Sequence, residues 1–303
     1  MNMRICSLLP SSTEILYALG LGDQVVAVTH ECDYPSEAAS KPQVTQSVID
    51  HERLSSMEID HRVSSNIGRH GSIYRLDEDL LESLKPDLII TQELCDVCAV
   101  SYKDVQRAAR LFEGATRIIS LEPNTLDDVF DTILTVGELT SRKQKAEEKV
   151  RELRERLAQV RSRVQGLRRP RVYAMEWLEP PFSGGHWVPE MVEIAGGQEV
   201  LGKPGVKSER ISPESILDAQ PEIIVLMPCG FSLDRTVQEY GRTAFFPDWK
   251  DLPAVRNGQV YAVDGSSYFN RSGPRLIDGV EILSEIFHPR GADVPNRNFK
   301  RLS

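Results

Sequence analysis

Apolar residues along this chain fall into short runs of four or five, separated by segments in which they recur at helical spacing. In the first half the runs predict strands at 5–9, 25–28, 88–91 and 117–121, and the spacing predicts helices at 10–20, 79–84 and 101–112. Ser11 or Ser12 is expected to cap the first helix. The second and third strands are separated by an insertion, 46–76, where Ser55 and Glu58 suit a capping box for a helix through Val63. Gly68 and Gly71 predict a loop after that helix.

The alternation restarts after Pro170, with strands predicted at 172–175, 223–227 and 260–263 and helices at 188–195, from 212 onwards, and at 275–287. Short apolar strands between helices are typical of a parallel sheet covered on both faces. The segment 78–90 matches 213–226: each reads as a helix, then Lys-Pro-Asp or Gln-Pro-Glu, then an apolar strand. We therefore predict an α/β protein made of two Rossmann-like lobes.

One long helix is predicted at the centre of the chain, from 141 to 167, with apolar residues recurring in steps of four and three along one face. The segment 141–171 holds 12 Lys and Arg against 4 Glu, whereas the rest of the chain holds 24 against 41. A coiled-coil dimer helix is one interpretation. We prefer a helix that connects the lobes and keeps its charged face in water. The predicted domains are 1–140 (with the insertion), 169–289, the connecting helix 141–168 and a flexible tail, 290–303.

Net charge and hydropathy exclude several classes of protein. A formal charge of −9 over 303 residues argues against a nucleic-acid partner, which would require a basic field. No stretch approaches the roughly 18 apolar residues of a membrane-spanning helix. The start, Met1 to Pro10, lacks the apolar stretch and cleavage site of a secretory signal, so we expect a cytoplasmic protein. An exported protein whose signal lies upstream of Met1 stays an alternative.

The loops that follow the predicted strands are rich in polar and aromatic residues. In an open parallel sheet, ligands bind outside the carboxyl ends of the strands, so these loops are the predicted binding region. Trp187 and Tyr268 suit a flat apolar ligand face, and Arg271 suits a carboxylate or phosphate. The predicted ligand-binding residues are Ser11, Ser12, His30, Tyr34, Gln92, Glu93, His186, Trp187, Tyr268, Asn270 and Arg271.

Five cysteines are an odd number for a chain of this length and do not form a disulfide framework. Cys95 and Cys98 have the spacing of redox and metal sites, and Cys32 and Cys229 follow two other predicted strands. These four are candidate ligands of zinc or an iron–sulfur cluster; the alternative is that each is a small buried apolar residue. Cys6, inside the first strand, is expected to be buried.

Several segments together resemble the solute-binding proteins for vitamin B12 and iron chelates that serve ATP-driven importers. They are Ser7-Leu8-Leu9-Pro10-Ser11-Ser12-Thr13-Glu14, Asp33-Tyr34-Pro35, Leu84-Lys85-Pro86-Asp87-Leu88-Ile89-Ile90, Pro180-Pro181-Phe182 and Ile211-Ser212-Pro213-Glu214-Ser215-Ile216-Leu217. The resemblance implies the class III solute-binding fold, with the ligand in a cleft between two lobes. Two further stretches, Thr91-Gln92-Glu93-Leu94-Cys95-Asp96-Val97-Cys98 and Tyr268-Phe269-Asn270-Arg271-Ser272-Gly273-Pro274, resemble a cytoplasmic, cobalamin-binding branch of this family. Glu214 matches one of the family's two permease-docking glutamates, but the other has no match here, which makes docking to a membrane transporter doubtful.

Two functional hypotheses follow. The first is a binding protein for a corrinoid (cobalamin-like) or related metal chelate, acting in intracellular salvage or handover. The second is an enzyme, or a metal or iron–sulfur protein, that reuses this fold with its cysteines as functional groups. The sequence shows no catalytic motif such as a nucleophile elbow, which favours a small-molecule binding protein. It predicts no oligomeric state.

Overall fold

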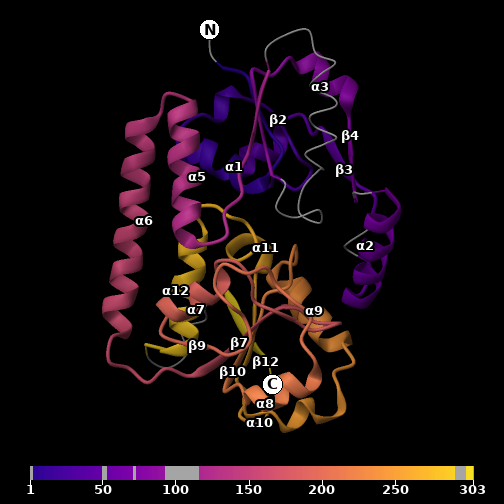
Figure 1. Ribbon diagram of the computed structural model, residues 1–303, viewed down its shortest axis with the longest axis vertical. Coiled ribbons are helices and arrows are strands. Elements are labelled where there is room, and N and C mark those ends of the chain that lie inside the picture. The colour runs from indigo at the N-terminus through magenta and orange to yellow at the C-terminus, as the bar shows by residue number, and fades with distance from the viewer. Residues whose placement is uncertain (1–2, 50–52, 71–72, 93–115, 291–297, 303) are drawn as a thin grey trace. The chain divides into compact units, whose positions relative to one another are not determined.

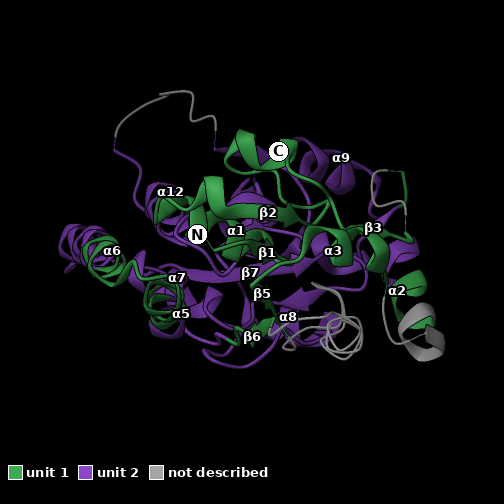
Figure 2. Ribbon diagram, turned by 90° about the horizontal axis from the view of Figure 1, so that it is seen from above, with its two compact units in different colours: residues 1–54, 61–122, 130–150 green, residues 55–60, 123–129, 151–303 purple. Residues whose placement is uncertain are grey.

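The chain forms two compact α/β units, which Figure 2 distinguishes by colour. The computed structural model describes residues 3–49, 53–70, 73–92, 116–290 and 298–302. Unit 1 comprises Met1–Leu54, His61–Glu122 and Phe130–Val150, and unit 2 comprises Ser55–Asp60, Pro123–Val129 and Arg151–Ser303. The division falls inside the long helix α6 (Lys143–Val164), so this helix contributes turns to both units.

Unit 1 is built on a four-stranded parallel sheet in the order β2-β1-β5-β6. The strands are β1 (Ile5–Ser7), β2 (Val25–Val28), β5 (Leu88–Thr91) and β6 (Arg117–Ser120), with a separate antiparallel pair, β3 (Thr45–Ser47) and β4 (Tyr74–Leu76). The helical elements are α1 (Pro10–Ala18), η1 (Gly22–Gln24), η2 (Ser36–Ser40) and α3 (Glu78–Leu84), together with α2 (Ser56–His70) and α5 (Leu126–Leu139), whose first residues belong to unit 2. Ser7 pairs with Val28 on one side and Ile90 on the other, so the strands end at one common edge.

Unit 2 is built on a sheet in the order β12-β11-β10-β7-β8, with β9 beside β7 (Figure 1). Its parallel centre is β7 (Arg171–Trp177), β10 (Ile223–Leu226) and β11 (Val260–Val263); the others are β8 (Phe182–Ser183), β9 (Gln198–Glu199) and β12 (Phe299–Leu302). The helical elements are α7 (Val188–Ile194), α8 (Pro213–Ala219), α9 (Leu233–Arg242), η3 (Pro247–Asp251), α10 (Pro253–Arg256), α11 (Gly265–Tyr268) and α12 (Leu276–Phe287). This architecture confirms the predicted α/β class with parallel sheets.

The predicted repeat forms the same hydrogen bonds in both units. They join an arginine at the start of the first strand to the last turn of the repeated helix. In unit 1, Arg4 donates from Nε and Nη2 to the carbonyl of Leu84, the last residue of α3, at 2.9 and 2.7 Å, and its backbone N–H donates to Asp87 Oδ2 at 2.7 Å. In unit 2, Arg171 donates from the same two nitrogens to the carbonyl of Ala219, the last residue of α8, at 3.1 and 2.5 Å. Its N–H donates to Glu222 Oε2 at 2.9 Å, and this bond lowers the pKa of the Glu222 carboxyl.

Both helices of the repeat end on a residue in the left-handed region. Lys85 and Gln220 each have φ of 44°, and each donates its N–H to the carbonyl three residues earlier. Such a residue turns the chain sharply out of the helix, and the proline that follows cannot continue it. A seven-residue helix is thereby joined to a four-residue strand in the same way in each unit.

The apolar face of α6 is buried as its spacing predicts. Ala146, Val150, Leu153, Leu157 and Val160 are each at most 4% exposed. In unit 2, Arg156 forms ion pairs with Asp278 at 2.5 Å and Glu281 at 2.7 Å, both on α12. In unit 1, the Cβ of Ala146 would approach a Cβ at Gly137 to 2.4 Å, so α5 and α6 pack closely only because position 137 is glycine.

The structure corrects four local predictions. Leu9, not Ser11 or Ser12, is the N-cap of α1, because Pro10 is already helical and Ser12 Oγ donates to the Leu9 carbonyl. The capping box of Ser55 and Glu58 is confirmed, but α2 continues to His70, so Gly68 lies in helix rather than loop. Helices α5 and α9 were not predicted, and the predicted helix 101–112 lies outside the described residues.

The predicted flexible tail is wrong over Phe299–Leu302, which form the edge strand β12 antiparallel to β11. The Phe299 ring contacts Tyr261 edge-on at 5.9 Å, and Arg301 donates to the carbonyls of Gly258 and Asn257. Four residues with one buried side chain, Leu302, carry too little apolar periodicity to be recognised. None of the described helices is long and apolar enough to span a bilayer.

We expect Arg171→Ala to lower the free energy of unfolding by about 1–2 kcal/mol, because two hydrogen bonds to the last carbonyl of α8 are lost. Urea denaturation measures this change. Arg168→Ala is the matched control: its side chain is 75% exposed, so its ion pair with Glu222 is worth little. An equal fall in the free energy of unfolding in the two variants would show that the hydrogen bonds of Arg171 contribute no more than an exposed ion pair.

The carboxyl group of Glu199 links two backbone segments of unit 2, β7 and the turn at 201–202. Its oxygens accept hydrogen bonds from the N–H groups of Ala174, Leu201 and Gly202 at 3.0–3.1 Å. Burial raises the pKa of Glu199 from its ordinary value of 4.5 to about 7, against the opposite effect of these donors. The neutral form is therefore favoured in the folded state. The stability it contributes is complete below pH 4.5 and is lost as the pH rises through 7.

We expect the free energy of unfolding of the wild type to fall by about 2 kcal/mol between pH 5 and pH 8 relative to that of Glu199→Gln. The amide cannot ionise, so the variant lacks this pH dependence. Urea denaturation at several pH values measures both profiles. Parallel profiles would contradict a raised pKa at Glu199.

Candidate functional site

The predicted binding residues of unit 1 follow the carboxyl ends of β1, β2 and β5. Register places these ends at one edge of the sheet, as described above. Ser11 and Ser12 lie in the first turn of α1, His30 and Cys32 follow β2, and Gln92 follows β5. Glu93, Cys95 and Cys98 lie outside the described residues, so their placement stays a prediction.

A cluster of hydroxyl groups and one thiol joins the loops after β1 and β2. Ser12 Oγ lies 2.6 Å from Ser7 Oγ, and Thr13 Oγ1 lies 2.8 Å from Ser7 Oγ and 3.1 Å from Cys32 Sγ. Thr29 Oγ1 is also 3.1 Å from Cys32 Sγ. All five side chains are buried. Thr13 and Cys32 therefore link the two loops, and the polar atoms of Ser12 and Cys32 are turned toward the protein rather than toward a ligand.

His30 is the best-oriented candidate of unit 1. Its Nδ1 lies 2.8 Å from Thr45 Oγ1, and its ring packs against Tyr74 at 5.4 Å between centroids. Its Nε2 lies 3.4 Å from Glu31 Oε1 and, within the described chain, is a buried atom without a hydrogen bond. The contacts with Thr45 and Tyr74 fix the orientation of the imidazole ring.

Two further residues complete the edge of unit 1. Tyr34 is 47% exposed, and Gln92 is half-buried. Thr91, the last residue of β5, has a buried hydroxyl with no hydrogen-bond partner among the residues described. Thr91 was predicted only as the last residue of a strand. Its polar side chain at the end of an otherwise apolar strand could have indicated a binding residue.

In unit 2, backbone contacts bind the loops after β7, β10 and β11 into one surface. The N–H of Cys229 donates to the Glu176 carbonyl at 3.2 Å, and the N–H of Ser266 donates to the Phe231 carbonyl at 3.1 Å. Gly265 lies so close to the β10 loop that a Cβ there would be 2.4 Å from the Pro228 carbonyl oxygen. The carboxyl edge of unit 2 is therefore preorganised.

The glycine-rich turn before α7 is hydrogen-bonded to this edge at both ends. Glu176 Oε1 accepts the N–H of Gly185 at 2.9 Å, and Trp187 donates from Nε1 to the Phe269 carbonyl at 2.7 Å. A Cβ at Gly185 would lie 2.2 Å from the Ser208 nitrogen, so only glycine fits. His186 is half-buried between them; burial and the nearby Lys207 lower its pKa, which favours a neutral imidazole at neutral pH. Trp187 is itself buried, so its ring supports the turn.

The loop after β11 carries the remaining predicted residues. Tyr268 is half-buried and packs beside the guanidinium of Arg275, 5.8 Å from the ring centroid. Asn270 follows it, and in the described part of the chain its buried Oδ1 accepts no hydrogen bond. Arg271 is half-buried on the same loop. A buried acceptor without a hydrogen bond raises the free energy of the folded state. A hydrogen-bond donor on a ligand would therefore stabilise Asn270 Oδ1 more than the other polar atoms of this edge.

Trp177 and Phe231 form an aromatic pair at the ends of β7 and β10, with ring centroids 5.3 Å apart. The guanidinium carbon of Arg235 lies 4.5 Å from the centroid of Phe231. Neither Trp177 nor Phe231 is among the residues predicted above to bind the ligand. The signal available for Phe231 was its position directly after the Pro-Cys-Gly turn that ends β10.

The cysteines differ in environment. Cys32 is buried in the hydroxyl cluster, Cys229 is exposed, and burial raises the pKa of the Cys6 thiol. Among the residues that the structure describes, no three His, Cys, Asp or Glu side chains are grouped as a metal site would need. Zinc or iron–sulfur binding stays a prediction that depends on Cys95 and Cys98.

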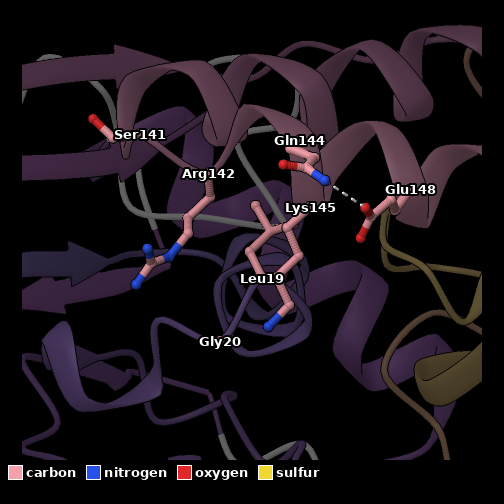
Figure 3. Close-up of a pocket in the computed structure, with 7 residues that line it drawn as sticks. All are labelled: Leu19, Gly20, Ser141, Arg142, Gln144, Lys145 and Glu148. Atoms are coloured by element: carbon pink, nitrogen blue, oxygen red, sulfur yellow. Dashed lines mark hydrogen bonds between the residues drawn. The ribbon is translucent and has the colours of Figure 1, made fainter.

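A separate pocket of about 440 Å³ lies in unit 1, between the end of α1 and the start of α6 (Figure 3). It is lined by Leu19, Gly20, Ser141, Arg142, Gln144, Lys145 and Glu148. Because α1 starts at the carboxyl end of β1, its last residues lie about 13 Å away, toward the opposite edge. This pocket is therefore distinct from the predicted binding edge.

Comparison with known proteins gives a consistent result. A sequence profile of the periplasmic binding protein family matches residues 5–266. The vitamin B12-binding protein of Vibrio cholerae serotype O1 is 28% identical over 282 residues, 92% of this chain and 86% of the relative. An uncharacterized ABC transporter substrate-binding lipoprotein of Bacillus subtilis is 26% identical over 293 residues, 94% of this chain and 80% of the relative.

Solved structures agree. The periplasmic vitamin B12-binding protein of Vibrio cholerae matches with a TM-score of 0.67 at 25% identity, over 94% of this chain and 96% of that one. A periplasmic heme-binding protein from Pseudomonas aeruginosa matches with a TM-score of 0.74 at 18% identity, over 100% and 99%. The second likeness shows the fold alone. Together they confirm the class III solute-binding fold predicted from the sequence.

We expect Cys229→Ser to remove one fast-reacting thiol from the native protein, and Cys32→Ser to leave the number of fast-reacting thiols unchanged. Cys229 is exposed, whereas Cys32 is buried in the hydroxyl cluster. Titration with a thiol-specific chromogenic disulfide counts these groups. Loss of a fast-reacting thiol in Cys32→Ser would show that the loops after β1 and β2 open readily.

Proposed function

The chain belongs to the periplasmic binding protein family, and we propose that it binds a corrinoid or a closely related metal chelate at the carboxyl edges of its sheets. The observation that carries this proposal is the likeness to vitamin B12-binding proteins. It extends over 92% of the chain in sequence and over 94% in structure. The heme-binding structures are less similar in sequence, at 17–23% identity, and make heme the natural competitor to test.

The chemistry of unit 2 supports this ligand class. A corrinoid presents a broad ring with amide side chains around its rim. Tyr268 offers an aromatic surface, and Asn270 Oδ1 offers a buried acceptor without a hydrogen bond in the described residues. An amide N–H of the ligand would satisfy that acceptor. His186, favoured as a neutral imidazole, adds a nitrogen that can accept a hydrogen bond or coordinate a metal.

In unit 1 the support rests on His30, Tyr34 and Gln92, because Ser12 and Cys32 are committed to the hydroxyl cluster. The engagement of Cys32 also weakens the hypothesis of a site built from four thiols. Salvage or handover inside the cell, predicted from the N-terminal sequence, stays a prediction that cell fractionation checks.

We expect Asn270→Ala and Tyr268→Ala each to weaken corrinoid binding about tenfold, since each removes one main contact worth roughly 1.4 kcal/mol. Isothermal titration with cyanocobalamin and dicyanocobinamide measures the dissociation constants, and hemin is titrated in parallel. Tyr261→Phe is the control: among the described residues, the partner of its hydroxyl is Gln259, beside the edge strand β12.

Two results would contradict the proposal. If the wild type bound neither corrinoid, the ligand class would be wrong. If both corrinoids bound but neither Asn270→Ala nor Tyr268→Ala changed their affinity, the carboxyl edge of unit 2 would not be the binding surface.

A further inference from the structure

The insertion contributes one helical turn to unit 2. Ser55–Asp60 are grouped with unit 2 by their contacts, although the rest of the insertion belongs to unit 1 (Figure 2). This turn, Ser56 to Asp60, is the start of α2. The turn contacts residues at the carboxyl edge of the unit 2 sheet, which is the edge proposed to bind the ligand.

Both backbone polar groups of Ser56 are held by unit 2. Its N–H donates to Glu239 Oε1 at 2.5 Å, and its carbonyl accepts the indole N–H of Trp177 at 3.2 Å. Ser56 is fully buried, and Glu239 is 1% exposed. The carboxylate thus accepts an N–H from the first turn of α2, where the helix dipole favours a negative charge.

Glu239 is fixed in turn by a charged partner. Arg235, one turn earlier on α9, donates to Glu239 Oε2 at 2.8 Å, and its guanidinium covers the Phe231 ring. Phe231 packs against Trp177. Indole, phenyl ring, guanidinium and carboxylate therefore form one chain of contacts that begins and ends at Ser56.

The far end of the turn has a second, more exposed attachment. Arg210 forms an ion pair with Asp60, in which Nη2 donates to both carboxylate oxygens, at 2.8 and 3.1 Å. Between the two attachments, Met57 is 54% exposed. The Ser56 hydroxyl is buried and lacks a hydrogen-bond partner within the described segments. The turn therefore leaves an apolar side chain in solvent and one polar group unsatisfied.

We propose that the first turn of α2 is a wall of the ligand-binding edge of unit 2, and that Trp177 and Glu239 are positioning residues that hold it there. This wall reduces the space open to a ligand beside the Trp177–Phe231 pair, and the site therefore selects ligands by size. The ligand in this inference is the one given by the proposed function. The position of the turn follows from the contacts of Ser56 and does not depend on that function.

The decisive variant is Trp177→Phe, which keeps an aromatic ring against Phe231 but removes the N–H that the Ser56 carbonyl accepts, together with part of the indole ring. Trp249→Phe is the matched control, because the buried Nε1 of Trp249 has no acceptor in the described structure, so no hydrogen bond is lost. Hydrogen exchange of the Met57–Asp60 amides in the ligand-free protein measures how often the turn opens. We expect exchange about fivefold faster in Trp177→Phe and unchanged in Trp249→Phe. Unchanged exchange in Trp177→Phe would overturn the positioning role.

The effect on the ligand is measured by stopped-flow dissociation of dicyanocobinamide and of hemin. We expect Trp177→Phe to change the ratio of the two dissociation rates by at least threefold, and Trp249→Phe to leave the ratio unchanged. Faster exchange with an unaltered ratio would show that the turn is held but is not a wall of the site. If the wild type bound neither ligand, the proposed function would fail, whereas the exchange measurement would still decide whether Trp177 holds the turn.

Discussion

In each unit, hydrogen bonds from an arginine tie the start of the first strand to the end of a neighbouring helix, and the rest of the structure depends on this constraint. In both units an arginine side chain donates twice to the last helical carbonyl, and its backbone pairs with the acidic residue that follows proline. The strand that follows the proline, β5 or β10, is therefore fixed in register beside β1 or β7. Because all these strands run parallel, fixed register at their starts aligns their carboxyl ends, and the loops that leave those ends converge on one edge.

That edge is organised differently in the two units. In unit 1, hydroxyl groups and a buried thiol link the loops after β1 and β2, which leaves His30 oriented by Thr45. In unit 2, backbone hydrogen bonds and a close approach at Gly265 link three loops, and Tyr268 and Asn270 lie after β11, on the third of them. A preorganised edge loses little conformational entropy on binding, which suits a protein that holds a large, rigid chelate.

The architecture could be predicted from sequence because its signals are strong and local. Apolar runs such as Ile223–Leu226 identify buried parallel strands, and the matching Lys-Pro-Asp and Gln-Pro-Glu segments mark the same joint twice. Site residues were harder to assign, because residue type does not say where a polar atom points. Ser12 and Cys32 have the chemistry of ligand-binding groups, but Ser12 is hydrogen-bonded to Ser7 and Cys32 to Thr13. The contact of Ser56 with Trp177 joins positions 121 residues apart, which no local pattern contains.

The central claim, that this chain binds a corrinoid, is tested most directly by one spectrum. The purified protein is incubated with cyanocobalamin, freed of unbound ligand by desalting, and examined by UV–visible absorption. The account predicts corrin bands that stay with the protein at close to one ligand per chain. A protein that leaves the column without corrin absorption, while retaining heme in a parallel sample, would contradict it.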